Sequence, residues 1–259
     1  MYRFFARNVQ KHETRIDPVY FEHNIFPHQT ESAEVNMCGR FVQKLSGEEL
    51  ARLFAGDLFA SELGERYNVA PTQPVLVVVE HDQHRVVTSH RWGLIPSWAK
   101  DPKIGVQMIN ARAETLAEKP AFRTSFRRQR CIVPADAFYE WQRHGTSKTP
   151  YAIVRRDGKP LAFAGLWSAW HKPDSDERIL SCTIVTTEAN ERLSSLHERM
   201  PVILPEESWS EWLDPTFQEI GPLQSLLRPY PSELLDAYPV SPRVNSVRND
   251  GPELLAKAG

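Results

Sequence analysis

Cysteine is scarce in this chain of 259 residues, and its placement excludes two classes of protein. Cys38, Cys131 and Cys182 are odd in number and lie far apart in the sequence. They predict no disulfide framework, which favours a reducing cytosol. None of the three has a partner at metal-ligand spacing, so we expect no metal site.

Long apolar runs are also lacking. No run reaches the roughly 18 residues that a membrane-spanning helix needs. The first 36 residues carry charges throughout, among them Arg3, Arg7 and Lys11, and lack the apolar stretch of a secretory signal. We therefore expect a cytoplasmic protein with no membrane partner.

Residues 1–36 differ from the rest of the chain, because they carry scattered charges and show no sustained hydrophobic period. We interpret them as a poorly ordered extension, or as the result of a start codon placed too early, since Met37 offers a second start. Residues 37–259 carry dense structural signals and contain no linker, so we expect a single domain there.

The chain as a whole lacks a large excess of positive or negative charge, since its formal net charge is −2. Between Arg85 and Arg156, however, 14 Lys and Arg stand against 5 Asp and Glu, an excess of nine positive charges. Tryptophans and other aromatics interleave with these charges. Positive charge can follow a phosphate backbone and aromatic rings can stack on unpaired bases. A solvated basic face beside ordinary core aromatics is the alternative interpretation.

Local patterns predict many short strands and few helices. Ser46–Glu49 resembles a capping box and precedes apolar residues at helical spacing, which predicts a helix. A turn is expected at 81–84. Apolar or β-branched runs predict strands at 75–79, 85–89, 131–133, 138–142, 151–154, 161–166, 181–187 and 200–204, with further helices near 189–193 and at 206–213. This pattern predicts an α+β domain built on antiparallel sheet.

Cys38 is a candidate nucleophile because it directly follows Met37. If translation begins at Met37 and that methionine is removed, Cys38 carries a free amine and a thiol on adjacent carbons. The amine condenses with an aldehyde to an imine, and the thiol then closes a thiazolidine ring. Ordinary pKa values of about 8 and about 8.5 leave both groups usable near neutrality. The ring-opened abasic site of DNA offers such an aldehyde. A buried, unreactive thiol is the alternative.

Two further residues are candidates for proton transfer. Glu140 lies between Phe138-Tyr139 and Trp141 in a predicted strand. Burial among aromatics would raise its pKa and suit acid–base chemistry, although an alternating strand could instead turn it to solvent. His197 lies between Leu196 and two charged residues before a predicted strand, which suits a proton shuttle or an ordinary surface loop.

Asn110 and Arg112 are candidates for binding rather than for proton transfer. The Asn110 amide can hold an amine or a sugar oxygen, and the Arg112 guanidinium can hold a phosphate. An asparagine that only caps a helix is the alternative for Asn110.

Nine segments, taken in order, resemble the SRAP family of SOS-response-associated peptidases, also described as abasic-site processing proteins. The resemblance covers nearly all of residues 37–259. It implies a compact α+β domain whose antiparallel sheets form an open barrel-like core with peripheral helices around a DNA groove, and no metal or organic cofactor. The matching segments are 37–41, 67–71, 91–96, 109–114, 130–134, 138–141, 163–167, 197–201 and 244–245.

The resemblance implies a role for each matching residue. Cys38 matches the N-terminal nucleophile, Asn110 the residue that positions the amine and sugar, Glu140 the acid–base residue and His197 the histidine that assists ring opening and proton transfer. A second set comprises candidate DNA-binding residues, with Arg40 and Arg112 expected on phosphates, the Pro71 and Trp92-to-Trp98 segments on bases, and Arg123 and Arg127 added from the basic stretch.

The leading hypothesis is a cofactor-free enzyme of the SOS response to DNA damage that captures abasic sites in single-stranded DNA through Cys38. We expect a monomer in the cytoplasm, bound at the nucleoid when on DNA. A thiol peptidase using Cys38 and His197, or a non-covalent single-strand binder, are the alternatives. Residues 1–36 depart from the family, whose members begin at the Met-Cys pair. Since a retained extension leaves Cys38 with an amide, we expect a mis-placed start or self-cleavage before Cys38.

Overall fold

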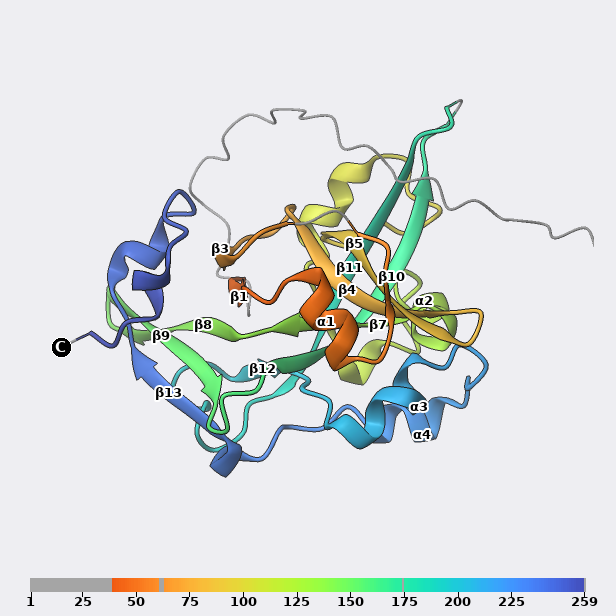
Figure 1. Ribbon diagram of the computed structural model, residues 1–259. Coiled ribbons are helices and arrows are strands. Elements are labelled where there is room, and N and C mark those ends of the chain that lie inside the picture. Colours follow the sequence, from red (N-terminus) through yellow and green to blue (C-terminus); the bar gives the residue numbers. More distant parts are fainter. Residues whose placement is uncertain (1–38, 61–62, 174, 259) are drawn as a thin grey trace, which may run out of the picture.

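The computed structural model describes residues 39–60, 63–173 and 175–258. The predictions for residues 1–36 and for Cys38 therefore lie outside the described residues. Within the described ranges, the strands form two sheets that pack against each other, with short helices around them (Figure 1).

The smaller sheet has five antiparallel strands in the order β13-β9-β8-β1-β3. In this sheet β1 lies between β8 and β3, so the first strand of the described chain is a central strand. Its strands are β1 (Phe41–Gln43), β3 (Arg66–Val69), β8 (Ala137–His144), β9 (Ser147–Arg155) and β13 (Leu235–Pro239).

The larger sheet has the order β12-β11-β10-β7-β4-β5-β2, with β6 paired to β11. Arg91 and Trp92 of β5 also pair in parallel with Ser181 and Cys182 of β11. This pairing closes β4, β5, β11, β10 and β7 into a small barrel, which confirms the predicted barrel-like core. The strands are β2 (Asp57–Leu58), β4 (Pro74–His81), β5 (His84–Trp92), β6 (Asn110–Arg112), β7 (Arg130–Ala135), β10 (Leu161–His171), β11 (Arg178–Glu188) and β12 (Arg199–Pro201).

The helices are short and peripheral, and α3 and α4 lie together at the lower right in Figure 1. The α-helices are α1 (Gly47–Leu53), α2 (Arg123–Arg128), α3 (Trp209–Leu213) and α4 (Ile220–Ser225). The 3-10 turns are η1 (Pro102–Gln107), η2 (Ala113–Thr115), η3 (Glu206–Ser208), η4 (Ser232–Leu234), η5 (Pro242–Asn245) and η6 (Pro252–Leu255). No helix among the described residues is both long enough and apolar enough to cross a bilayer.

The barrel strands bury both of their faces. On β4, Val75 and Val77 join Phe138 of the other sheet in a core that we call the inter-sheet core. Leu76 and Val78 point the other way and pack with residues of the helices. Burial on both sides explains why residues 75–79 are apolar without alternation.

Arg130 holds two helix ends together from inside the protein. Its side chain is almost fully buried, and burial lowers its pKa to about 10. The guanidinium donates to the carbonyl oxygens of Phe126 at the end of α2, of Trp212 in α3 and of Phe217 beyond it. Phe126 and Trp212 lie in the last turns of their helices, where carbonyls lack partners within the helix, so the arginine satisfies them.

Most local predictions are confirmed. Ser46 and Glu49 form the complete capping box before α1, and the strands begin and end close to the predicted positions. Asp82 and Gln83 have φ values of 50° and 66°, as the two-residue turn of a β-hairpin requires. The prediction of a helix at 206–213 is confirmed by η3 and α3.

Two local predictions need correction. Residues 191–196 form successive turns, so the helix predicted near 189–193 is wrong. The Asn190 side chain accepts the N–H of Leu193 and donates to the Tyr230 carbonyl, and such side-chain bonds compete with helix formation. The strand predicted at 200–204 is shorter and ends with β12. Beyond it, the Val202 N–H donates to the Val185 carbonyl of β11 and the Leu204 N–H donates to the Ala162 carbonyl of β10.

Candidate functional site

The described chain begins beside the strand that carries Glu140. Phe41 of β1 pairs with Phe138 of β8, and the Arg40 carbonyl accepts the Tyr139 N–H at 3.0 Å. Gly39 and Arg40, which we call the chain start, therefore run antiparallel to the residues that lead to Glu140. Gly39, the first described residue, is the covalent neighbour of Cys38.

Glu140 is buried, with only 4% of its surface exposed, which favours the buried carboxylate over the solvent-facing alternative. Side chains alternate along β8, so Glu140 shares a face with Phe138 of the inter-sheet core, whereas Tyr139 packs in a separate core. Directly opposite on β9 is Tyr151. The carboxylate therefore lies on the side of the small sheet that faces the barrel.

The loop that carries His197 lies on that same face. Leu196 packs against the inter-sheet core, and the Ser195 carbonyl accepts Nε2 of Gln142 at 3.4 Å. Gln142 is two residues after Glu140 and so points the same way. These contacts bring the His197 loop and the Glu140 strand together.

A hydrogen bond to His197 Nδ1 indicates the tautomer of its neutral ring. The Arg199 backbone N–H donates to His197 Nδ1 at 3.1 Å. A nitrogen that accepts a hydrogen bond carries no proton, so the neutral ring holds its proton on Nε2. His197 thus presents an N–H donor, and the ring is half-buried.

Asn110 and Arg112 lie on β6, which runs parallel to β11. Asn110 pairs with Ile184 and Arg112 with Thr186. Asn110 is therefore the first residue of a strand rather than the cap of a helix. Ile184 belongs to the inter-sheet core, which places the Asn110 strand beside the core that Phe138 and Leu196 also contact.

Glu114 and Arg199 connect the Asn110 segment to the His197 segment, and the sequence analysis did not identify this pair. The Arg199 guanidinium donates from Nη1 to Glu114 Oε1 at 2.6 Å and from Nη2 to Oε2 at 2.9 Å. These bonds lower the pKa of Glu114. Nη2 also donates to the carbonyl of Thr186, the residue that pairs with Arg112. Both residues lie in the segments that carry the family resemblance, but their sequence gives no sign that they pair.

The prediction for Trp92 as a DNA-stacking residue is corrected by its burial. Trp92 is 0% exposed and packs edge-on against Phe41, with 5.0 Å between the ring centroids. Its indole N–H donates to the Ile109 carbonyl. Its ring is therefore part of the core and has no free face for a base. Trp98, further along the same segment, is 59% exposed.

The segment that carries Trp98 is anchored against the β10–β11 hairpin. The Gly93 N–H donates to the Cys182 carbonyl, and the Trp170 indole donates to the Ala99 carbonyl at 2.7 Å. Gly93 and Gly105 lie so close that a methyl group on either would come within 2.6 Å of the other's carbonyl oxygen. The exposed Trp98 ring is thus carried on a fixed loop.

Pro71 lies in a tight turn that rests on the barrel. The Gln73 N–H donates to the Ala70 carbonyl, and Thr72 has a φ of 73°. A β-branched residue rarely adopts this conformation. The Thr72 N–H donates to the Trp92 carbonyl at 2.8 Å and holds the turn in place. Pro71 is partly exposed there, and its contact with DNA stays a prediction.

The predicted phosphate-binding arginines differ in their surroundings. Arg112 and, on α2, Arg123 and Arg127 are exposed. Arg40 instead donates to Asn68 and to the Val244 and Asn245 carbonyls. Burial lowers its pKa. Phosphate contact by these arginines stays a prediction.

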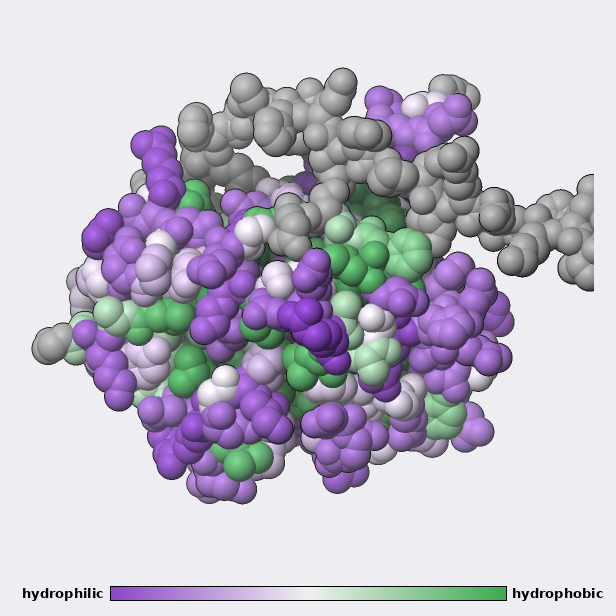
Figure 2. Space-filling model, viewed as in Figure 1, coloured by the Kyte–Doolittle hydropathy of each residue, from purple (hydrophilic) through white to green (hydrophobic). Residues whose placement is uncertain are grey.

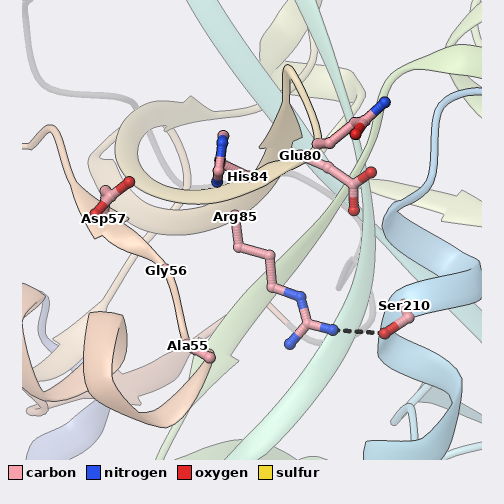
Figure 3. Close-up of a pocket in the computed structure, with 8 residues that line it drawn as sticks. Ala55, Gly56, Asp57, Glu80, His84, Arg85 and Ser210 are labelled. Atoms are coloured by element: carbon pink, nitrogen blue, oxygen red, sulfur yellow. Dashed lines mark hydrogen bonds between the residues drawn. The ribbon is translucent and has the colours of Figure 1, made fainter.

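A cavity of about 400 Å³ lies elsewhere, between the α1–β2 loop, the β4–β5 hairpin and α3 (Figure 3). Arg85 crosses it and donates to Ser210 Oγ at 2.7 Å, while Glu80 and His84 line its rim. None of the predicted site residues lines this cavity. Across residues 39–60, 63–173 and 175–258, no group of His, Cys, Asp and Glu is arranged to hold a metal ion.

The barrel, the small sheet and the site between them define an α+β protein in which Gly39 and Arg40 run beside the strand of the buried Glu140. The family model of the SOS response associated peptidases (SRAP) matches residues 37–247, and the chain belongs to this family. The family resemblance of the sequence is thereby confirmed.

Relatives that are named as abasic site processing proteins support the same assignment. The chain is 46% identical over 223 residues to the abasic site processing protein YoqW of Bacillus subtilis (strain 168), covering 85% of this chain and 99% of that protein. It is 35% identical over 229 residues to the abasic site processing protein YedK of Escherichia coli (strain K12), with the same shares covered. A crystal structure of a Bacteroides thetaiotaomicron protein has a TM-score of 0.78 at 29% identity, covering 85% of this chain and all of that one.

Proposed function

We propose that this protein captures abasic sites in single-stranded DNA by forming a covalent thiazolidine between Cys38 and the opened sugar. The observation that carries the proposal is the position of the chain start. Gly39 and Arg40 run beside the strand of the buried Glu140, and the His197 loop packs on the same face of that strand. The names of the relatives supply the substrate class.

The proposed chemistry needs a free amine on Cys38, and we propose that the mature protein begins at that residue. The amine adds to the sugar aldehyde and water is lost, which gives an imine. The thiol sulfur then adds to the imine carbon, and its proton goes to the nitrogen. Glu140 moves protons during the loss of water, since a buried carboxylate suits that task. Asn110 positions the Cys38 amine relative to the sugar.

His197 acts on the closed form of the sugar. Because its neutral ring carries the proton on Nε2, that N–H can donate to the ring oxygen and favour the open aldehyde. Arg112 and Arg40 are proposed to contact the phosphates on either side of the lesion. Trp98 and Pro71 are proposed to contact neighbouring bases, with Arg123 and Arg127 on more distant phosphates.

The same tautomer disfavours a thiol peptidase acting on other proteins. A histidine that activates a thiol takes the proton on one ring nitrogen while the other donates to an acceptor. In this protein Nδ1 faces the Arg199 N–H donor, so Nε2 holds a proton instead of accepting one. Peptide cleavage in trans is therefore the outcome that would count against the proposal.

The test uses protein that starts at Met37 and a single-stranded oligonucleotide with one abasic site. We expect an adduct that survives heating on a denaturing gel, and its loss in Cys38→Ala. Cys182→Ala is the matched control, because that thiol is buried inside the barrel and should be dispensable. A durable adduct formed equally well by Cys38→Ala would reject the proposal, and salt-sensitive binding without any adduct would favour a non-covalent binder.

Glu140→Gln separates chemistry from binding in the same assay. We expect slower adduct formation with little change in affinity for the oligonucleotide, because the proposed role is proton transfer. Equal losses in rate and affinity would contradict this role. The intact mass of protein made from its native start would show whether Cys38 is its first residue.

A further inference from the structure

The C-terminal loop from Ser241 to Asn249 is hydrogen-bonded to Arg40 in the chain start. Arg40 Nη1 donates to the Val244 carbonyl at 2.9 Å, and Nη2 donates to the Asn245 carbonyl at 3.3 Å. Arg40 is two residues from Cys38, and its own carbonyl is bonded to β8 through the Tyr139 N–H. Arg40 is thus held through both its backbone and its side chain.

Asn68 of β3 joins Arg40 and the loop. Its side-chain oxygen accepts Arg40 Nη1 at 2.9 Å. Its side-chain nitrogen lies 2.8 to 3.2 Å from the carbonyl oxygens of Val244, Ser246 and Asn249 and donates to them. With 2% of its surface exposed, Asn68 is sealed from water, so these bonds are its means of satisfying a buried amide.

The loop also reaches the residue next to Glu140. The Trp141 indole N–H donates to Asn245 Oδ1 at 2.7 Å. The loop therefore contacts the chain start on β1 and the Glu140 strand, β8, at the same time. It is further anchored by Val244, which is fully buried in one core with Val42 and Tyr139.

The outer side of the loop is exposed from Pro242 to Arg248 except at Val244. Figure 1 places the segment after β13 beside the small sheet, and Figure 2 shows that this part of the surface is mostly hydrophilic. Val247 is an exposed hydrophobic residue of the loop. An exposed loop of this kind would be mobile if only its own backbone held it. The bonds from Arg40, Asn68 and Trp141 fix it instead.

We propose that Asn68 and the C-terminal loop form a positioning device that fixes the chain start relative to Glu140, with Asn68, Arg40 and Asn245 as its positioning residues. This inference rests on the proposed function. Positioning matters for a reaction between two tethered groups, because a misplacement of about 1 Å can slow such a step by about a hundredfold. Through Asn68 and Asn245 the device acts on the rate of ring closure, and the phosphate contact proposed for Arg40 is separate from this role.

The experiment is single-turnover adduct formation by Met37-start protein at increasing concentrations of abasic oligonucleotide. We expect Asn68→Ala to lower the rate at saturating DNA by about tenfold or more, with the half-saturating concentration within about twofold of wild type. Asn245→Ala removes only an exposed side chain and its bond to Trp141. Asn245→Ala should also lower the rate at saturating DNA. It is the replacement test if Asn68→Ala does not fold.

Arg248→Ala is the matched control, because Arg248 is an exposed residue of the same loop and should leave both parameters unchanged. Unchanged saturating rates in Asn68→Ala and Asn245→Ala would overturn the inference. So would rate and affinity that fall together, or an Arg248→Ala variant that alone weakens binding, since the loop would then be a DNA contact.

A measurement without DNA separates this inference from the proposed function. Amide hydrogen exchange at Tyr139, whose N–H donates to the Arg40 carbonyl, should accelerate in Asn68→Ala. Unchanged exchange would overturn the positioning role. Accelerated exchange together with a wild-type protein that forms no adduct would keep the structural link and reject the proposed chemistry.

Discussion

Arg199 and Glu114 are 85 residues apart in the chain, and the guanidinium of one holds both carboxylate oxygens of the other. The Arg199 side chain is 11% exposed, whereas that of Glu114 is 53% exposed. The pair therefore lies at the edge of the site, with its positive partner inside. It joins the strand of Asn110 and Arg112 to the loop of His197.

Glu114→Gln should destabilise the protein by about 1 kcal/mol at pH 7, because the enclosed guanidinium loses its charged acceptor while solvent screens the half-exposed carboxylate. The Arg199 hydrogen bond lowers the pKa of Glu114 below its ordinary value of 4.5. The stabilisation is thus present above pH 4.5 and is lost as the pH falls below it. Urea unfolding should show that the difference between wild type and variant shrinks in acid. Glu118→Gln is the control, and a difference that stays constant in acid would contradict the assignment.

His90 should make the folded protein less stable as the pH falls. Burial lowers its pKa from 6.5 to about 3, with a smaller contribution from the charge of Arg178. Because the folded pKa is the lower one, stability is kept above pH 6.5 and lost as the pH falls toward 3, by up to about 1.4 kcal/mol per pH unit. His90→Phe preserves the stack on Trp167 and should flatten urea-derived stability between pH 6.5 and 5. The exposed His171→Asn should retain the wild-type slope, and an equally steep slope in His90→Phe would refute this prediction.

Gly105→Ala should displace the loop that carries Trp98. The added methyl group would come within 2.6 Å of the Gly93 carbonyl oxygen, so one of the two backbones must move. We expect a loss of about 1–3 kcal/mol in unfolding free energy and weaker binding of single-stranded DNA. Gly221→Ala is the control, since its methyl group would meet no atom within 4 Å. Wild-type stability and affinity in Gly105→Ala would show that the contact is not restrictive.

Two tryptophans of one segment should respond in opposite ways to truncation. Trp92→Ala empties part of the core and should cost about 3–5 kcal/mol of stability. Trp98→Ala removes an exposed ring and should weaken single-strand binding by about 1–3 kcal/mol while leaving the unfolding curve unchanged. Fluorescence anisotropy and urea unfolding measure the two effects. Equal DNA affinity in Trp98→Ala and wild type would remove this residue from the interface.

Local features of the fold were predictable from sequence because neighbouring residues determine them. The capping box of Ser46 and Glu49 involves residues three apart, and the apolar run 75–79 records burial on both faces of one strand. The helix predicted near 189–193 failed because Asn190 is bonded to the carbonyl of Tyr230, 40 residues away. Distant partners of this kind leave no local pattern.

The site was predictable to the extent that its residues carry recognisable chemistry. The aromatic neighbours of Glu140 made burial one of two alternatives, and the structure shows that Glu140 is buried. Trp92 carries the same aromatic signal as Trp98, and only the three-dimensional packing separates a core ring from an exposed one. The barrel closes through the parallel pairing of β5 with β11, in which Trp92 lies opposite Cys182. No spacing of residues in the sequence predicts this pairing.

The bond between Arg40 and Val244 spans 204 residues, so its acceptor is among the last parts of the protein to leave the ribosome. A nascent chain can complete β1 and β3 long before that carbonyl exists. A chain that ends soon after β13, or is cleaved there by a protease, loses the carbonyl acceptors of Arg40 and of Asn68 in the loop, and Arg40 keeps only its bond to Asn68. Only copies that extend through Asn249 can therefore hold their first strand in this way.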